Sequence, residues 1–291
     1  MSESLHHTPL FPALYVVATP IGNLGDITLR ALDILQRVDR VAAEDTRVSG
    51  QLLAHFNISR PLVSIREHNE REAADGVIAR IVAGDAVAYV SDAGTPAVSD
   101  PGARLVAAVR AAGLRVVPVP GASAVTAALS AAGVAPGTWL FHGFLPPRPG
   151  ARRAQLQSLA ALPAALVFYE APHRIEETLA DMADVLDSAR QVTLARELTK
   201  RFETIVTLPL ADASAWLAAD PNNVRGEFVV IVHPPVTEIT IDAEAMRVLG
   251  ILQDALPPTL AARLAAQITG RSKAELYKMS LALKPREQDD A

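Results

Sequence analysis

The sequence predicts an α/β protein with a first domain on a mostly parallel sheet, a second domain with a mixed sheet, and a helical segment at the carboxyl end. Three observations support this fold class. Apolar strand-like runs alternate with amphipathic helical patterns, which is typical of βαβ units. Glycine-containing turns follow three of the early runs. A proline pair, Pro234-Pro235, separates the last strand-like run from a segment with helical spacing only.

Composition narrows the class of protein. The chain has 291 residues, enough for about two domains of ~150 residues each, and half of them are apolar. It has no cysteine, which excludes disulfides and thiolate sites, and no cluster of His, Asp and Glu has the spacing of a metal site. No apolar run approaches the ~18 residues of a membrane span, and the amino terminus lacks a secretory pattern. We therefore expect a soluble, cytoplasmic protein with neither a metal nor a membrane partner.

The first domain is predicted to span residues 12–133, with five strands joined by helices. The predicted strands are the apolar runs 13–18, 40–43, 62–65, 86–90 and 115–119. The predicted helices are 28–37, a segment after Arg47 with Leu52, Leu53 and Phe56, then 72–83, a segment opened by Asp100-Pro101, and 123–132. Asp100 is the expected N-cap of the fourth helix, because proline is favoured at the position that follows an N-cap.

Three turns of this domain, 19–26, 91–96 and 119–124, each join a strand to a helix and contain glycine. The carboxyl ends of parallel strands meet the amino ends of helices at one edge of a sheet, where open α/β folds bind their ligands. Glycine lets the backbone approach a bound molecule closely. The three turns therefore predict a ligand site at this edge.

The second domain is predicted to span residues 134–235. Its expected strands are 139–145, 165–169, 191–196, 204–208 and 227–232. Short connections make the strand at 204–208 antiparallel to its neighbours. Two helix faces are marked by Leu156, Leu159 and Leu162, and by Ile175, Leu179, Met182 and Leu186.

The helical segment is predicted to span residues 243–285 and to resemble a helix-turn-helix. Leu260, Leu264 and Ile268 share one helix face, and the turn at 269–272 leads to a second face. Residues 259–286 include six basic residues and one acidic residue, although the whole chain has a net charge of −5. This local charge predicts a phosphate-facing surface.

The turns carry neither of two common nucleotide motifs. The first lacks the dinucleotide pattern G-x-G-x-x-G, and no Walker motif is present in the sequence. Asp26, Asp92 and Asp100 can accept hydrogen bonds from ribose hydroxyls or an amino group. A nucleoside-containing cofactor that needs no metal remains as the expected ligand.

Six motifs in order carry a family resemblance. They lie at residues 18–26, 43–47, 67–70, 90–96, 118–124 and 168–174. Together they resemble the tetrapyrrole-methylase-like superfamily of S-adenosylmethionine enzymes, and within it the methyltransferases of small-subunit ribosomal RNA. The resemblance covers residues 12–285. It implies methyl transfer from S-adenosylmethionine to the 2′-hydroxyl of a cytidine in 16S rRNA, with the assembled 30S subunit as the expected substrate. It also implies a homodimer with its cofactor between two α/β domains.

The resemblance also implies site residues. S-adenosylmethionine is expected at the strand-end turns and at a second-domain wall; the residues are Pro20, Gly22, Asp92, Ala93, Gly94, Pro96, Val98, Ser123, Ala124, Glu170, Ala171, Gly226 and Glu227. Four residues are candidates to orient or accept the hydroxyl proton: Glu44, Asp45, His68 and Glu170. RNA phosphates are expected at Arg47, Arg148, Arg152, Arg153, Arg174, Arg263, Arg271, Lys273 and Lys278. Arg148, Arg152 and Arg153 have no acidic residue near them in the sequence.

Plainer interpretations stay open. The glycines serve equally well as turn residues, Asp92 as a cap, and the helical segment as a dimerisation element. Two other functions also stay open: a tetrapyrrole C-methyltransferase of the same fold, and a nucleic-acid-binding regulator that senses a nucleoside without turnover.

Overall fold

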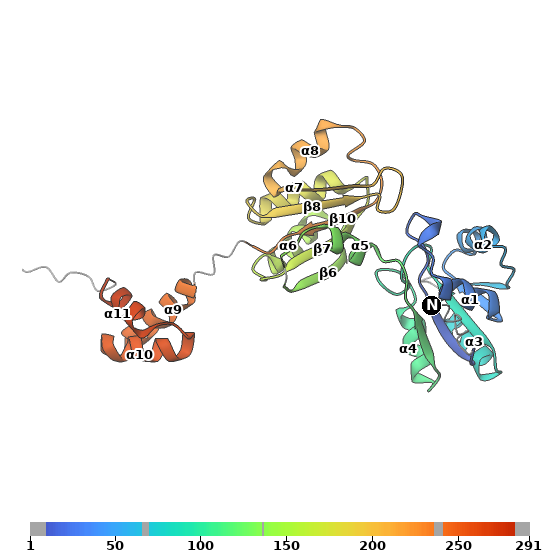
Figure 1. The fold of residues 1–291 in the computed structure, drawn as a ribbon, viewed down its shortest axis with the longest axis horizontal. Coiled ribbons are helices and arrows are strands. Elements are labelled where there is room, and N and C mark those ends of the chain that lie inside the picture. Colours follow the sequence, from blue (N-terminus) through green and yellow to red (C-terminus); the bar gives the residue numbers. More distant parts are fainter. Residues whose placement is uncertain (1–9, 66–69, 136, 236–240, 283–291) are drawn as a thin grey trace, which may run out of the picture. The chain divides into compact units, whose positions relative to one another are not determined.

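The computed structural model describes residues 10–65, 70–135, 137–235 and 241–282. Internal contacts divide the chain into two compact units, which meet in the sequence at His233 and Pro234. The first unit contains two five-stranded sheets and the second contains helices (Figure 1). None of the helices in the described part of the chain is both long and apolar enough to cross a membrane.

The first sheet is entirely parallel, with strand order β3-β2-β4-β1-β5. Its strands are β1 (Ala13–Val17), β2 (Arg40–Ala43), β3 (Leu62–Ser64), β4 (Ala86–Val90) and β5 (Val116–Val119). Its helical elements are η1 (Leu24–Asp26), α1 (Leu29–Arg37), α2 (Thr46–His55), α3 (Glu70–Val82) and α4 (Ala103–Ala111). Successive residues of a strand point to opposite faces. Tyr15 therefore packs with α1 and α2, whereas Leu14 packs with α3 and α4.

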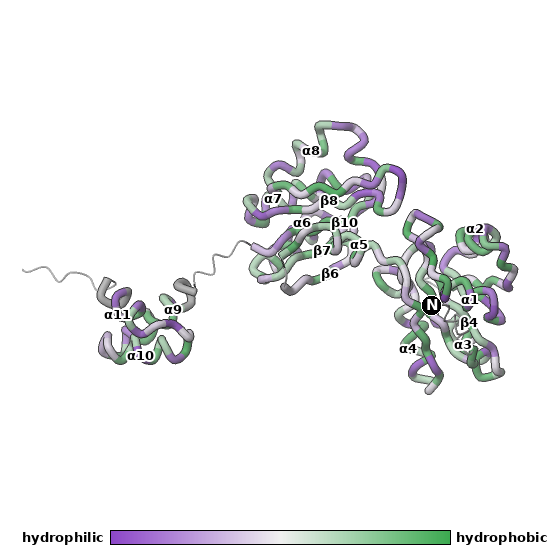
Figure 2. Tube along the Cα trace, viewed as in Figure 1, coloured by the Kyte–Doolittle hydropathy of each residue, from purple (hydrophilic) through white to green (hydrophobic). Residues whose placement is uncertain are grey.

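The second sheet is mixed, with strand order β6-β7-β10-β8-β9. Its strands are β6 (Trp139–Phe144), β7 (Ala165–Glu170), β8 (Gln191–Arg196), β9 (Thr204–Pro209) and β10 (Phe228–Val232). Strands β6 and β7 are parallel, and the remaining pairs are antiparallel, as expected for β9. The inner strands β7 and β10 are mainly hydrophobic (Figure 2).

Helices cover both faces of this second sheet. One face packs against α6 (Pro149–Leu159), α7 (Ile175–Val185), η2 (Leu210–Asp212) and α8 (Ala213–Ala219). The other face packs against α5 (Ala124–Ala131), through Val125 and Ala128. Helix α5 follows β5 directly, so it carries the chain from the first sheet to the second rather than covering the first.

The second unit consists of α9 (Ile241–Gln253), α10 (Pro258–Thr269) and α11 (Lys273–Ala282) within the described residues. Its small core is built from Leu249, Leu276 and alanines of α9 and α10. Helix α10 ends at Gly270, which has a φ of +71° and so adopts the left-handed conformation that closes many helices. The segment thus has helices joined by tight turns, as the sequence predicts.

Candidate functional site

The three glycine-containing turns meet at the carboxyl ends of β1, β4 and β5. Thr19 and Gly94 exchange backbone hydrogen bonds of 2.9 and 3.0 Å. The Thr95 hydroxyl donates to the Ala122 carbonyl oxygen over 3.0 Å. Gly94 has a φ of +78°, a conformation that side chains disfavour. Hydrogen bonds therefore join the first turn to the second and the second turn to the third at the predicted site.

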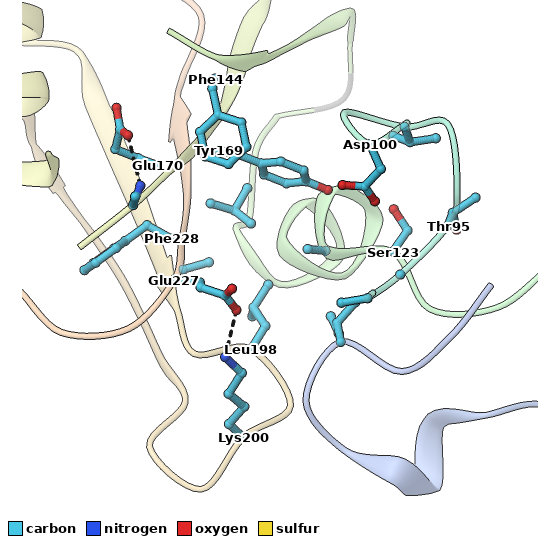
Figure 3. Close-up of a pocket in the computed structure, with 18 of the residues that line it drawn as sticks. Thr95, Asp100, Ser123, Phe144, Tyr169, Glu170, Leu198, Lys200, Glu227 and Phe228 are labelled. Carbon is cyan, nitrogen blue, oxygen red and sulfur yellow. Dashed lines mark hydrogen bonds and ion pairs between the residues drawn. The ribbon is translucent and has the colours of Figure 1, made fainter. Parts of the chain in front are cut away.

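A cavity of about 300 Å³ opens between these turns and the second sheet (Figure 3). The first sheet contributes its turns, and the second contributes the ends of β6, β7, β8 and β10. Its lining residues are Ile21, Ala93, Gly94, Thr95, Val98, Asp100, Ser123, Ala124, Phe144, Tyr169, Glu170, Ala171, Pro172, Ala195, Leu198, Lys200, Glu227, Phe228 and Val229. A volume near this value lies at the lower end of the range for small-molecule sites.

Polar groups of the cavity gather around Tyr169. Helix α4 begins at Ala103 with Gly102 as its N-cap, so Asp100 is not the cap that the sequence predicts. The Asp100 carboxyl instead turns toward the Tyr169 hydroxyl (Figure 3). Burial and the negative charge of Asp92 raise the pKa of Asp100. A hydrogen bond with Ser91 lowers this pKa but does not outweigh them. Ser123 occupies the N-cap position of α5 but its side chain makes no capping hydrogen bond.

Carboxylates also gather behind the second turn. The Asp45 backbone N–H donates to Asp92 Oδ1 over 3.0 Å, and the Asp92 N–H lies 3.5 Å from Glu44 Oε2. Burial and the negative charge of Asp92 raise the pKa of Glu44, despite the backbone hydrogen bond from Asp92. A carboxylate with a raised pKa is a better proton acceptor than an ordinary one.

Lys200 closes one side of the cavity. Its ammonium group donates to Glu197 and Glu227 over 2.8 Å each. Burial alone would lower the pKa of Lys200, but these two hydrogen bonds and charges raise it. Its aliphatic chain lies against Gly22, where an added Cβ would be 2.4 Å from Lys200 Cγ. Gly22 thus allows the Lys200 side chain to pack closely on the first turn.

Comparison with known proteins decides the family. Residues 13–214 match the family model described as Tetrapyrrole (Corrin/Porphyrin) Methylases, and residues 239–284 match the RsmI C-terminal HTH domain. A Pseudomonas aeruginosa protein named ribosomal RNA small subunit methyltransferase I is 54% identical over 271 residues, covering 92% of this chain and 96% of the relative. The chain belongs to the ribosomal RNA small subunit methyltransferase I family. A relative of the same name from Escherichia coli O157:H7 is 48% identical over 269 residues, covering 92% of this chain and 94% of the relative.

Solved structures confirm the fold expected for this family. A cobalt precorrin-4 methyltransferase has a TM-score of 0.57 at 18% identity, covering 76% of this chain and 95% of that chain. The uroporphyrin-III C-methyl transferase of Thermus thermophilus complexed with S-adenyl homocysteine has a TM-score of 0.54 at 19% identity, covering 76% and 97%. These structures therefore confirm the two α/β domains that the sequence predicts, and the methyltransferase activity follows from the family.

Most of the residues expected to hold the cofactor of this methyltransferase lie at the cavity or beside it. Eight of them line the cavity: Ala93, Gly94, Val98, Ser123, Ala124, Glu170, Ala171 and Glu227. Pro20, Gly22 and Asp92 line a second, adjoining cavity. Pro96 and Gly226 line neither of the two. Their roles in binding stay predictions.

The sequence missed most of the side chains that the second sheet contributes. Phe144, Tyr169, Leu198, Lys200 and Phe228 line the cavity without belonging to the expected set. Two of these residues could have been found from the sequence. Lys200 is the one lysine of the sequence outside residues 273–284, and Tyr169 immediately precedes Glu170 in a motif. Phe144 and Leu198 carry no comparable local signal.

The candidates for proton transfer differ in how strongly other contacts hold their side chains. Both carboxylate oxygens of Glu170 are occupied: one accepts from the Ala171 N–H over 2.9 Å and the other from the Thr178 hydroxyl over 2.7 Å. Its side chain is 1% exposed and points away from Asp100 and Tyr169 (Figure 3), so these contacts argue against Glu170 as the proton acceptor. His68 lies outside the described residues.

Asp45 has a structural task of its own. It is the N-cap of α2, and its carboxylate accepts from the Arg47 N–H over 2.8 Å and pairs with the Arg47 guanidinium. Glu44 is left as the described candidate whose carboxylate is bound least tightly. The hydrogen bond that it accepts from the Asp92 N–H has the long distance of 3.5 Å.

Two arginines expected at RNA phosphates make structural contacts instead: Arg152 is buried and Arg174 is partly buried. Arg152 is 1% exposed and pairs with Asp181 over 2.5 Å. Arg174 donates to the Leu145 carbonyl oxygen over 2.7 Å and lies 3.3 Å from Glu170. Neither can reach a phosphate without breaking these contacts, which therefore argue against their assignment to RNA. The acidic partner of Arg152 lies 29 residues away, beyond the reach of local sequence patterns.

Other basic residues of the predicted RNA surface are exposed. Arg153 is half exposed, although it also pairs with Asp181 and Asp184. Arg47 is 82% exposed beside Asp45, and Arg271 lies 3.9 Å from Glu275. Arg148, Arg263, Lys273 and Lys278 are exposed as well.

Within the described part of the chain, no group of three or more His, Asp or Glu side chains is arranged to hold a metal ion.

Proposed function

We propose that this chain transfers a methyl group from S-adenosylmethionine to the 2′-hydroxyl of a cytidine in 16S rRNA, within the 30S subunit and in the cytoplasm. The observation that carries the proposal is the cavity at the carboxyl ends of β1, β4 and β5, in a chain of this methyltransferase family. The relatives' name supports ribosomal RNA of the small subunit as substrate. The solved relative with S-adenyl homocysteine supports the cofactor.

The residues of the cavity fit this cofactor. The rings of Phe144 and Tyr169, whose centroids are 5.7 Å apart, offer apolar surface to a base. Asp100 and Ser123 offer hydrogen-bonding groups to ribose hydroxyls or to an amino group. The backbone at Gly94 permits close contact with a bound molecule. S-adenosylmethionine supplies an electrophilic methyl group when it is bound.

Methylation of a hydroxyl releases its proton, which requires an acceptor. A 2′-hydroxyl is a weak nucleophile while protonated, so a carboxylate that orients it or takes its proton accelerates attack. We assign this role to Glu44, because its raised pKa suits a base and Glu170 and Asp45 are held by other contacts. Much of the remaining acceleration comes from holding the reacting atoms in line.

Exposed basic residues support the RNA substrate. Arg148 is the exposed N-cap residue of α6, and Arg263, Lys273 and Lys278 are exposed on the helical unit. Contacts of such residues to phosphates position an RNA without reading its sequence. We assign phosphate contacts to these four residues and to Arg47.

The direct test uses the purified full-length protein, S-adenosylmethionine with a labelled methyl group, and small ribosomal subunits that lack the modification. We expect label in one cytidine of the small-subunit rRNA, resistant to alkali at the adjoining phosphodiester because the 2′-oxygen is blocked. Large subunits are the control and should stay unlabelled. Label on a base, or none at all in the small subunit, would refute the proposal.

A further inference from the structure

A second cavity, here called the α2 chamber, adjoins the cofactor cavity. Its volume is about 480 Å³, and it lies between the first turn and helix α2. The two cavities share Ile21, Ala93, Lys200 and Glu227 as lining residues. A molecule in the α2 chamber therefore lies next to whatever occupies the cofactor cavity.

One face of α2 forms a wall of the chamber. Val48, Gln51, Leu52 and His55 all line it, and their spacing of three and four residues places them on the same side of a helix. Leu24 of η1 is also part of the lining. Leu24 and Val48 are 40% and 41% exposed, so both offer apolar surface to the chamber. The wall thus combines apolar surface with amide and imidazole groups.

Ser49 gives an independent sign that the chamber takes a polar ligand. It lines the chamber and is 3% exposed. Its buried hydroxyl oxygen has no hydrogen-bond partner among the described residues. An unsatisfied buried hydroxyl costs free energy, and most such groups in folded proteins are paired. A ligand with a donor or acceptor at this point would pair it.

We propose that the α2 chamber binds the target nucleoside, turned out of the RNA chain, with its ribose toward the cofactor cavity. This inference rests on the proposed function. A cavity of this size admits one nucleoside but no stretch of duplex, and enzymes that modify a nucleotide commonly extrude it into such a pocket. Leu24, Val48 and Leu52 would pack on the base, while Ser49 and Gln51 would bond its edge.

The position of the carboxylates agrees with this placement. Asp92 lines the α2 chamber, and its backbone N–H lies 3.5 Å from Glu44 Oε2. The ribose of a nucleoside bound there would therefore meet the carboxylates at the boundary with the cofactor cavity. The same placement brings its 2′-hydroxyl to the side on which the methyl group is supplied.

The test compares two tryptophan substitutions on one exposed helix. Val48→Trp fills the α2 chamber, whereas Ala54→Trp adds the same side chain at an exposed position of α2 outside the lining. We expect Val48→Trp to lower kcat/KM for small ribosomal subunits at least tenfold and to leave the Kd for S-adenosylmethionine within about twofold. Ala54→Trp should leave both values within about twofold of the wild type.

A smaller substitution guards against a folding defect. Ser49→Ala removes only the hydroxyl, and one lost hydrogen bond should lower kcat/KM for subunits by roughly three- to tenfold with cofactor binding unchanged. Normal kcat/KM in Val48→Trp would overturn the inference, and a matching loss of cofactor affinity would assign the chamber to the cofactor. In both cases the proposed function stands if the wild type methylates subunits; it falls only if the wild type does not.

Discussion

Arg152 shows how a basic residue can serve the fold instead of the ligand. Its guanidinium is held inside the first unit by Asp181, at 2.5 Å from Nε, and by Glu177 at 3.3 Å. The Asp181 side chain is 5% exposed, whereas that of Glu177 is 68% exposed. A buried charge without its partner is far more costly than an exposed one. The two acids should therefore contribute very differently to stability.

The first prediction concerns this pair. Asp181→Asn should lower the free energy of unfolding by about 3 kcal/mol, because it removes the buried charged partner of Arg152 and leaves only the exposed Glu177 to pair with it. Glu177→Gln is the matched control and should change it by less than about 0.5 kcal/mol, since exposed ion pairs contribute little. Urea unfolding measures both values. Equal effects of the two substitutions would contradict the structural role given to Asp181.

The pH dependence of that stability has a defined sign. Burial tends to raise the pKa of Asp181, but hydrogen bonds from Arg153 and Arg152 outweigh it and leave the pKa lowered. A carboxyl whose pKa is lower in the folded state stabilises the protein above its unfolded pKa, and this stabilisation is lost as pH falls through the folded pKa. The difference in unfolding free energy between wild type and Asp181→Asn should therefore shrink as the pH is lowered below about 4.

A second prediction concerns Glu44 as proton acceptor. Its pKa is raised by burial and by Asp92, so kcat/KM for subunits should fall as pH drops through that raised value. Glu44→Gln should lower the rate about 100-fold and abolish this acidic decline. Asp45→Asn, which alters the cap of α2, should keep it. A pH profile of the Glu44 variant that matches the wild type in height and shape would exclude Glu44 as the base.

At the scale of elements, we expect the turn after β4 to hold the cofactor. Gly94 has a φ of +78°, and a Cβ there would lie 3.2 Å from Ile21 Cγ2. Gly94→Val together with Asp92→Ala should weaken S-adenosylmethionine binding more than tenfold, because the strained turn can no longer present its backbone. Isothermal titration calorimetry measures the affinity.

The control substitution lies in the turn that follows α4. Gly113 has a φ of +74° with no atom within 4 Å of an added Cβ, so Gly113→Val imposes similar strain away from the cavity. It should destabilise the fold without changing cofactor affinity. If the Gly94 and Asp92 double variant binds S-adenosylmethionine within about twofold of the wild type, the cofactor site lies elsewhere.

Local patterns predicted the strands and the position of the site. Leu14 and Tyr15 pack on opposite faces of a sheet that helices cover on both sides. Because both faces are buried, the whole strand is apolar, and a continuous apolar run identifies it in the sequence. The three turns could be found because glycine and proline mark them. Thr19 and Gly94 then meet because parallel strands end at one edge of the sheet.

Contacts between distant residues explain what the sequence did not predict. Asp100-Pro101 has the pattern of a helix start, yet α4 begins at Ala103 and leaves Asp100 to the cavity. Arg152 seemed free of acids because Asp181 lies on a different helix. The second-sheet lining, such as Phe144 and Leu198, depends on how strands β6 and β8 are ordered, which single-strand patterns do not encode.

At the scale of the whole molecule, the helical unit is separate in its internal contacts from residues 1–233. Removing residues 234–291 should raise KM for small subunits and reduce its salt dependence, because exposed cations that contact phosphates are lost. Cofactor affinity should stay unchanged. Kinetics between ~0.05 and 0.2 M salt, with circular dichroism as the check on folding, measure the effect. A folded truncated protein with unchanged kinetics would show that the unit does not bind RNA.

A homodimer is the expected assembly. Strand β6 is an edge strand on which Trp139 is 49% and Leu140 is 37% exposed, and an exposed apolar edge suits an interface between copies. Sedimentation at micromolar concentration should therefore give about twice the chain mass of 30.8 kDa. Trp139→Lys should shift the equilibrium toward the single chain. A wild-type protein that sediments only as a single chain would contradict this expectation.

The central claim is 2′-O-methylation of one cytidine in small-subunit rRNA, and mapping that modification in cells tests it most directly. Ribosomal RNA from cells with and without this protein is compared by 2′-O-methylation mapping and by mass spectrometry of nucleosides. The account predicts one 2′-O-methylcytidine in 16S rRNA that disappears without the protein and returns when the protein is restored. An unchanged pattern of 2′-O-methylation in cells that lack the protein would contradict it.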